Sequence, residues 1–292
     1  MLAMRWPWPW RLAGAALMAP LLLYAPARPA PGSFELLAAD VGQGNAVLVR
    51  TAGHSLLYDA GPRYSLDSDA GQRVLAPLLR AGGERLDLLV LSHRDSDHTG
   101  GASALLQAYP GAALLSSMEE AHALQAQRRA MRCQAGQAWT WDGVAFSVLH
   151  PLPADYASAA KPNALSCVLR ISAGDRVALL VGDIEMAQER ALIERAAPLA
   201  ADVLLAPHHG SRTSSSPAFV QAVGARWVLV QAGYRNRFGH PVAEVLARYR
   251  GAGAQVVDSS RCGAMHWRSA SPEMVHCQRE LGARYWWHRP AG

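Results

Sequence analysis

Two histidines and two aspartates lie within one six-residue segment, His93-Arg94-Asp95-Ser96-Asp97-His98. The segment follows an apolar run over residues 86–91 that predicts a buried strand, and it precedes two glycines and a helical pattern. Open α/β sheets bind ligands at the carboxyl ends of their strands. Because four such side chains would repel and desolvate one another without a cation, the spacing predicts a metal site rather than a solvated acidic loop with incidental histidines.

The composition is that of a folded protein with a large core. Half of the 292 residues are hydrophobic and 17% are charged, and no internal repeat or low-complexity tract follows the first thirty residues. The net charge of +5 suits a polyanionic partner. The basic residues are spread along the chain without long runs, however, so charge alone is weak support for nucleic-acid binding.

The first 32 residues differ from the rest. Tryptophans at positions 6, 8 and 10 are followed by an apolar run over residues 12–25 and a linker over residues 27–32. This pattern is typical of a membrane-anchoring segment with interfacial tryptophans, and a secretory signal peptide gives a similar one. Either would bring the following domain to the membrane or across it. We therefore expect an anchoring or export segment with its linker at residues 1–32 and one domain at residues 33–292.

Hydrophobic periodicity and turn residues predict an α/β domain whose first half is rich in strands. Strands are expected at residues 34–39, 46–50, 55–59, 86–91, 139–141, 144–149, 165–171, 176–181, 203–206, 226–231 and 255–258. Helices are expected at residues 72–81, 102–108, 185–197, 217–223 and 242–250. Helices and strands therefore alternate in the second half.

The four cysteines show no Cys-x-x-Cys spacing, so a zinc knuckle is not expected. Cys262 and Cys277 flank two short strand-like stretches that would form a hairpin, whereas Cys133 precedes one strand pair and Cys167 lies in the next. We expect the pairs Cys133–Cys167 and Cys262–Cys277, which require an oxidising compartment. Spacing alone is equally compatible with four free thiols, and the N-terminal segment favours the disulfides.

Six segments resemble, in chain order, the metallo-β-lactamase superfamily and, within it, the C-terminal domain of the ComEC family of DNA-uptake channels. The segments are residues 40–45, 57–61, 92–101, 181–185, 207–211 and 236–241. The superfamily signature His-x-His-x-Asp-His corresponds to His93, Asp95, Asp97 and His98. The resemblance begins near residue 40 and does not include the channel, so the chain resembles a fragment or a split form of such a protein.

The resemblance implies an αββα four-layer sandwich with two metal ions at one edge, here preceded by the N-terminal apolar segment. His93 and Asp95 would bind one metal ion, and Asp97 and His98 the second. Asp183, which ends a predicted strand, would bridge the two ions.

Two further ligand positions follow from the same resemblance. One of His208 and His209 would complete the second metal's ligands, and His208 is the preferred candidate. The remaining position falls near Asn163, with Ser166 close by, and His150 is the other candidate.

Where the superfamily motif has histidines, this chain has Asp95 and the Asn163 region. Oxygen ligands in place of imidazoles move the preference of a site from Zn²⁺ toward Mn²⁺ or Mg²⁺. We therefore expect two divalent cations, Mn²⁺ or Zn²⁺, with Mg²⁺ also compatible. Two such ions can activate a water molecule and neutralise charge on a phosphodiester.

Further residues are expected to act on a substrate or to support the ligands. Asp97 would orient water or accept its proton, and His240 would donate to the leaving oxygen, although His240 equally fits a histidine bound to its own turn. Asp40 and Asp59, at strand ends, would brace loops around the site. The candidates for phosphate binding are Ser211, Arg212, Thr213, Ser214 and Asn236, and the alternative for the serine-rich segment is a simple helix N-cap.

The resulting hypothesis is a metal-dependent nuclease that acts on DNA during natural transformation. It would lie on the periplasmic side of the inner membrane, degrade the non-transported strand, and work with a membrane channel and other competence proteins. One alternative is a non-catalytic module that holds DNA for the channel. Another is a metal-dependent ester, thioester or lactone hydrolase, because fold alone does not choose among these chemistries.

Overall fold

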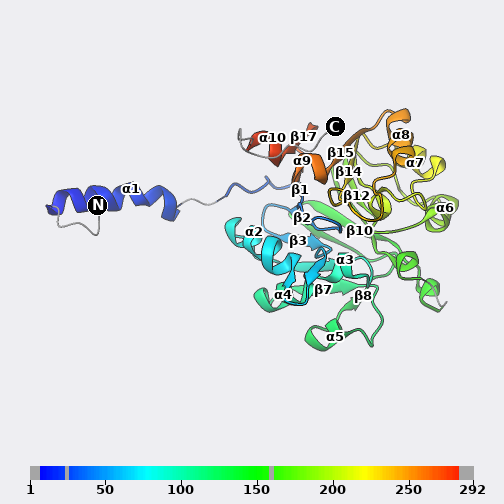
Figure 1. Cartoon of the computed structure of the whole chain (residues 1–292), viewed down its shortest axis with the longest axis horizontal. Helices are drawn as coiled ribbons and strands as arrows, with labels where there is room; N and C mark the ends of the chain where they lie inside the picture. Colours follow the sequence, from blue (N-terminus) through cyan, green and yellow to red (C-terminus); the bar gives the residue numbers. More distant parts are fainter. Residues whose placement is uncertain (1–6, 24–25, 158–160, 283–292) are drawn as a thin grey trace.

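Two mixed β-sheets pack face to face in the computed structural model, which describes residues 7–23, 26–157 and 161–282 (Figure 1). The first sheet has the strand order β17 (Ser271–Cys277), β16 (Met265–Arg268), β1 (Glu35–Ala38), β2 (Val47–Arg50), β3 (Ser55–Tyr58), β6 (Leu88–Leu91), β7 (Ala113–Ser116) and β8 (Met131–Arg132). Pairing is antiparallel from β17 to β3 and parallel from β3 to β8.

The second sheet is likewise half parallel and half antiparallel. Its order is β15 (Gln255–Asp258), β14 (Trp227–Val230), β13 (Val203–Leu205), β12 (Arg176–Leu180), β11 (Val168–Ala173), β10 (Val144–His150) and β9 (Ala138–Trp141). Pairing is parallel from β15 to β12 and antiparallel from β12 to β9. A separate small hairpin is formed by β4 (Arg63–Ser65) and β5 (Ser68–Asp69).

Helices cover the outer face of each sheet (Figure 1). The first sheet is covered by a π-helical turn, η1 (Gly71–Leu75), and by α2 (Ala76–Ala81), α4 (Ala102–Ala108) and α5 (Ala123–Gln127). The second is covered by α6 (Met186–Glu194), α7 (Pro217–Val223) and α8 (Ala243–Gly251). The short helices are α3 (Ser96–Thr99), α9 (Ser259–Cys262), α10 (Gln278–Leu281), η2 (Pro153–Ala157), η3 (Pro162–Leu165) and η4 (Pro207–Gly210).

Strand periodicity explains the four layers. In β2, Val47 and Val49 point into the core between the sheets, while Leu48 packs under the helices of the first sheet. Both faces of each sheet are therefore apolar, and three separate buried clusters fill the three interfaces of an αββα sandwich. The expected fold is confirmed; the parallel strands β7 and β8 and helix α5 were not predicted.

Both expected disulfides are present. Cys133–Cys167 connects the chain after β8 of the first sheet to the start of β11 in the second, across the core between the sheets. Cys262–Cys277 joins the end of α9 to the end of β17.

The N-terminal apolar run forms helix α1 (Trp8–Leu23), which lies beside the layers rather than within them (Figure 1). Among the described residues, none of the helices combines the length and the apolarity needed to cross a bilayer.

The linker after α1 already contacts the domain at Arg28, which precedes the predicted domain boundary at residue 33. Arg28 donates to the carbonyls of Thr51 and Ala52 and forms an ion pair of 2.6 Å with the buried Glu84. The outer bounds of the two predicted regions, residues 1 and 292, lie outside the described residues.

Candidate metal centre

Three loops at the carboxyl ends of parallel strands converge at one edge of the sandwich. Residues 92–98 follow β6, Asp183 follows β12, and His208 and His209 follow β13 in η4. Both histidines have positive φ, 50° and 54°, which turns the chain sharply after the strand. The strand ends thus fix the positions of the side chains, as the position of residues 93–98 after a predicted strand indicated.

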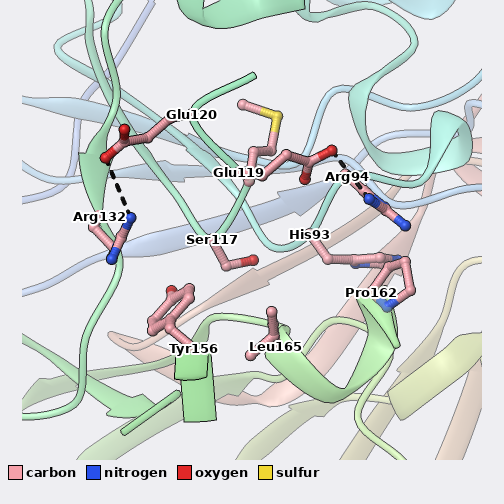
Figure 2. Close-up of a pocket in the computed structure, with 10 residues that line it drawn as sticks. His93, Arg94, Ser117, Glu119, Glu120, Arg132, Tyr156, Pro162 and Leu165 are labelled. Carbon is pink, nitrogen blue, oxygen red and sulfur yellow. Dashed lines mark hydrogen bonds and ion pairs between the residues drawn. The ribbon is translucent and has the colours of Figure 1, made fainter. Parts of the chain in front are cut away.

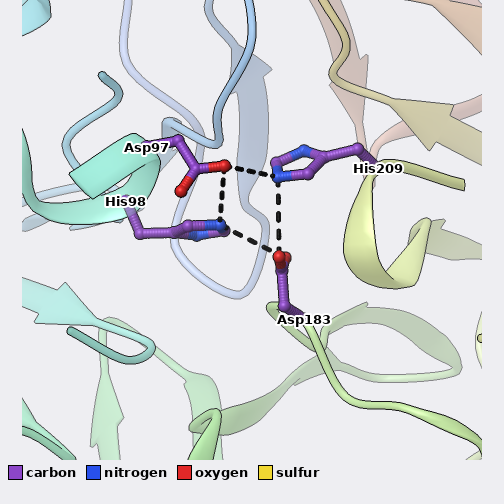
Figure 3. Close-up of side chains that lie close together, drawn as sticks. All are labelled: Asp97, His98, Asp183 and His209. Atoms are coloured by element: carbon purple, nitrogen blue, oxygen red, sulfur yellow. Dashed lines mark hydrogen bonds and ion pairs between the residues drawn. The ribbon is translucent and has the colours of Figure 1, made fainter. Parts of the chain in front are cut away.

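Asp97, His98, Asp183 and His209, called the metal group below, form a compact cluster (Figure 3). Each offers one ligand atom, and these atoms all lie within 4.8 Å of one another. His98 Nε2 is 3.2 Å from Asp183 Oδ1, and His209 Nε2 is 3.2 Å from Asp97 Oδ2 and 3.6 Å from Asp183 Oδ2. Asp97 is the partly exposed member, whereas the other three are buried.

Neighbouring groups hold both histidine rings with Nε2 toward the metal group. His98 Nδ1 lies 2.8 Å from Oδ2 of the fully buried Asp59, and the amide and hydroxyl of Ser92 donate to the same carboxylate. His209 Nδ1 donates to the carbonyl of Gln231 at 2.9 Å. A carboxylate or carbonyl behind a histidine is the usual way to orient a metal ligand. Asp59 therefore lies where a supporting residue was expected.

The electrostatics of the metal group favour ionised carboxylates. Burial opposes ionisation of Asp97, but the hydrogen bond from His209 and the charge of His98 lower its pKa to about 2. Burial also opposes ionisation of Asp183, and the same two histidines hold its pKa well below the ordinary value. Burial would lower the pKa of His98, yet the negative charges of Asp183 and Asp59 raise it well above the ordinary value.

The residues present fit a divalent cation. Among the described residues, His98 Nε2 and Asp183 Oδ1 are buried and in contact without hydrogen-bond geometry, and His93 Nε2 is buried without a hydrogen-bond partner. Leaving buried polar atoms unpaired costs free energy, which a cation among them would offset. Two imidazoles and two carboxylates form a mixed donor set that suits Zn²⁺ or Mn²⁺.

The other expected ligands lie around this group. His93 has its ring centroid 4.2 Å from that of His98, and its Nε2 is 3.6 Å from Asp95 Oδ2. His208 Nε2 is 3.7 Å from Asp183 Oδ2, while its Nδ1 is 3.2 Å from Thr213 Oγ1. The compact group thus contains His209 rather than the preferred His208, because the turn in η4 buries His209 and leaves His208 at the rim.

The segment expected to supply the least defined ligand reaches the site through Ser166. His150 is tied to its own loop, with Nε2 2.8 Å from the carbonyl of Ala164 and Nδ1 3.5 Å from Asp155. Asn163 lies in η3, where its carbonyl accepts from the amide of Ser166. The side chain that reaches the site from this segment is that of Ser166, which is 3.4 Å from His93 Nδ1 and accepts from the amide of Asp183.

The structure divides the phosphate-binding candidates. Ser214 is fully buried and donates to the carbonyls of Pro207 and Ser211, which makes it a loop brace rather than a substrate ligand. Ser211 is also buried and bonds with Thr213. Arg212 is exposed, 3.9 Å from Glu244, and Thr213 lies at the rim.

Asn236 braces the loop that carries His240. Its amide nitrogen donates to the carbonyls of Gly233 and His240, and its oxygen accepts from the amides of Phe238 and His240. Both amide protons are used, so a contact with phosphate would have to replace one of these bonds.

His240 lies at the rim of the site. Its ring centroid is 5.8 Å from that of His208, and its Nδ1 is buried with no hydrogen-bond partner in the part of the chain that the structure describes. Burial and the neighbouring histidines lower the pKa of His240. Asp40, the other expected supporting residue, instead pairs with Arg279 of α10 at 2.7 Å.

One residue beneath Asp97 was missed by the sequence interpretation. Asn45 is fully buried, and its backbone amide donates to the carbonyl of Asp97 at 3.2 Å. Its side-chain amide has no hydrogen-bond partner within residues 7–23, 26–157 and 161–282. The signal was present in the sequence, because a polar residue directly after a Gly-x-Gly turn is a candidate for close contact with another loop.

The sequence matches known proteins along most of its length. The model of a family described as "Metallo-beta-lactamase superfamily" matches residues 39–226. Competence protein ComA of Neisseria gonorrhoeae is 34% identical over 283 residues, which are 96% of this chain and 38% of that protein. Recombination protein 2 of Haemophilus influenzae is 35% identical over 216 residues, 73% of this chain and 26% of that protein.

The chain therefore spans about a third of the length of these relatives. Their match, with that of the superfamily model, confirms the resemblance to the ComEC family. Among solved structures, the metallo-beta-lactamase fold protein YhfI from Bacillus subtilis superposes with a TM-score of 0.54 at 15% identity, covering 81% of this chain and 99% of that one. At this identity the likeness concerns the fold alone.

Proposed function

We propose, from the premise that this chain belongs to the metallo-beta-lactamase superfamily, that it is a metal-dependent phosphodiesterase acting on DNA during uptake. In this proposal it degrades the strand that is not transported. The observation that carries the hydrolase assignment is the metal group Asp97, His98, Asp183 and His209. The choice of DNA as substrate is supported by relatives named for competence and recombination.

The metal group would hold one divalent cation, and His93 and Asp95 with the shared Asp183 would hold a second, while His208 lies 3.7 Å from the same Asp183 carboxylate. Bound divalent cations supply positive charge to a phosphate and lower the pKa of water. Asp97, partly exposed and with a lowered pKa, stays ionised at neutral pH and would orient water or accept its proton. His240, whose pKa is lowered by burial, is neutral there and would donate a hydrogen bond to the leaving oxygen rather than act as a charged acid.

The N-terminal segment would anchor or export the domain, so that it acts on the periplasmic side of the inner membrane. The two disulfides suit an oxidising compartment. The partners would be DNA, a membrane channel and other competence proteins.

The point where the linker contacts the domain can be compared with the position of the metal group. Arg28 binds at the turn where β3 begins, and β3 ends just before Asp59 beneath the metal group, roughly 13 Å further on at the usual rise per residue. The linker and the metal group therefore lie at opposite edges of the sandwich. A membrane-bound α1 would therefore tether the domain through the edge opposite the site.

The full chain should be offered linear duplex and single-stranded DNA with Mn²⁺, Mg²⁺ or Zn²⁺, beside the variant Asp97→Ala. Metal-dependent cutting that the variant loses is the expected result. Binding of DNA without cutting would replace the proposal with the non-catalytic coupling module, which the lack of a histidine in the sequence of residues 161–166 favours. Neither binding nor cutting, together with turnover of ester, thioester or lactone substrates, would replace it with the acyl hydrolase.

A further inference from the structure

A cavity of about 280 Å³ lies beside the metal site and shares His93 with it (Figure 2). Its other walls come from the loop after β7, from β8, and from η2 and η3. The lining residues used below are Arg94, Glu119, Glu120, Arg132, Tyr156 and Leu165. Since the ring of His93 lies 4.2 Å from that of His98, a molecule held in the cavity is adjacent to the metal group.

The wall of the cavity offers flat surfaces. The guanidinium of Arg132 lies over the ring of Tyr156, 5.0 Å from its centroid. The Tyr156 hydroxyl donates to the carbonyl of Cys133 at 2.5 Å, which holds the ring in place beside the disulfide. Leu165 adds an apolar contact. Aromatic rings and guanidinium planes are the groups on which proteins stack unpaired bases.

The charges of the wall suit a base better than a phosphate. Glu119 is 3.0 Å from Arg94, and Glu120 is 3.4 Å from Arg132, so each arginine is already paired with a carboxylate. These carboxylates would repel a phosphate group. They can accept hydrogen bonds from the N–H groups on the edge of a base.

We propose that this cavity binds the base of the nucleotide next to the phosphate that is cut, with the base stacked on Tyr156. The inference rests on the proposed function and narrows its substrate to unpaired DNA, because a base in a duplex would first have to leave its stack. Stacking is tolerant of sequence, which suits an enzyme that degrades DNA of any sequence.

Binding is tested without cleavage, with the full chain in the Asp97→Ala background and a fluorescent single-stranded oligonucleotide. Adding Tyr156→Ala should weaken binding about 5- to 150-fold, the range for loss of one base–aromatic stack, whereas Tyr156→Phe should bind like the parent. Tyr64→Ala is the matched control, since Tyr64 is a partly exposed tyrosine whose hydroxyl also donates to a carbonyl, that of Val41. Should Tyr156→Ala not fold, Arg132→Ala, whose side chain is 46% exposed, removes the other flat surface and should also weaken binding.

The position of the base is tested by cleavage with Asp97 intact. Oligonucleotides with a single abasic residue are cut by the parent protein and by Tyr156→Ala. At one position next to the cut, removal of the base should lower the cleavage rate of the parent as much as Tyr156→Ala lowers it on the intact oligonucleotide. The variant should cut that abasic oligonucleotide no more slowly than the intact one. Additive losses at every position would overturn the inference.

The two proposals fail in different ways. If the parent protein cuts DNA and Tyr156→Ala binds and cuts equally well, the cavity assignment is wrong while the nuclease stands. If the parent cuts no DNA but binds single strands through Tyr156, the nuclease is wrong, and of the cavity assignment only the stacking of a base on Tyr156 stands. If single strands are not bound at all, the cavity assignment is wrong as well.

Discussion

At the scale of single residues, the metal group depends on side chains that do not belong to it. The fully buried Asp59 accepts from Ser92 through both of its oxygens and contacts His98 Nδ1, so its charge fixes which nitrogen of His98 faces the cluster. Gln231 plays the same part for His209 through its carbonyl. The chemistry of the site is therefore set as much by these partners as by the ligands.

Asp59→Asn should lower the affinity for Mn²⁺ or Zn²⁺ about 10- to 100-fold, because the amide keeps the shape but not the charge that orients His98. Isothermal titration of the metal-free protein measures this loss. Asp40→Asn is the matched control, since Asp40 pairs with Arg279 away from the metal group, and it should bind metal like the parent. Equal affinity in Asp59→Asn and the parent would contradict the assigned role.

The pH dependence of metal binding follows from the same residues. In the metal-free protein, His98 and His209 have a raised pKa, so they stabilise the fold fully below the ordinary value of 6.5 and progressively less as the pH rises through the folded value. Asp97 and Asp183 have a lowered pKa, so their contribution is present above the ordinary value of 3.8 and is lost as the pH falls. The stability that these four residues contribute to the metal-free protein should be largest between about pH 4 and 6.5.

A metal ion must displace the protons of both histidines, so its affinity should rise with pH. We expect the increase in Tm on addition of Mn²⁺ to be larger at pH 8 than at pH 6. Thermal unfolding with and without the metal measures the difference. If the increase in Tm were independent of pH, the metal would not be displacing protons from the two histidines.

At the scale of elements, the site depends on how closely the loops approach one another. Gly44 lies against the carbonyl of Asp97, where an added Cβ would be 2.2 Å from the oxygen. Gly101 is equally close to the backbone of Gly71 at the start of the π-helical turn. These contacts require glycine because no side chain fits between the two backbones.

Gly44→Ala should displace the loop of Asp97 and lower metal affinity at least tenfold, since the clash is with backbone rather than with a movable side chain. Gly42→Ala is the control: φ at Gly42 is also positive, 76°, but no atom of the described residues lies within 4 Å of the added Cβ. It should lose about 1–2 kcal/mol of stability from strain and retain metal binding. Denaturant unfolding and metal titration of both variants separate strain from the clash.

At the scale of the whole molecule, the two sheets are joined near the site by the Cys133–Cys167 disulfide. Cys167 follows Ser166, whose hydroxyl contacts His93, and the carbonyl of Cys133 holds Tyr156. The other disulfide, Cys262–Cys277, lies at the opposite margin of the first sheet. Only the first of the two therefore connects to the metal site and the cavity.

Replacing Cys133 and Cys167 by serine should cost roughly 3–4 kcal/mol of stability and also weaken metal binding. Replacing Cys262 and Cys277 should cost about 3 kcal/mol, because the crosslinked loop is shorter, 15 rather than 34 residues apart, and should leave metal binding unchanged. Urea unfolding and metal titration of the two double variants test both parts. Equal metal affinity in the parent and both double variants would show that the Cys133–Cys167 disulfide does not support the metal site.

The resemblance to a known family implied the four-layer sandwich, and the N-terminal segment favoured the disulfides over free thiols. Composition and spacing by themselves determined an α/β domain, most of its elements and the segment that contains half of the metal group. These follow from local information: strand periodicity, turn residues, and metal-capable side chains close together in the chain. The tertiary structure decided what depends on packing between distant segments. It placed His209 rather than His208 in the metal group, buried Ser214, turned Asn236 and His150 toward their own loops, and brought Tyr156 beside His93. No spacing along the chain encodes these outcomes, because each depends on how a loop turns after its strand and on which backbone it then meets.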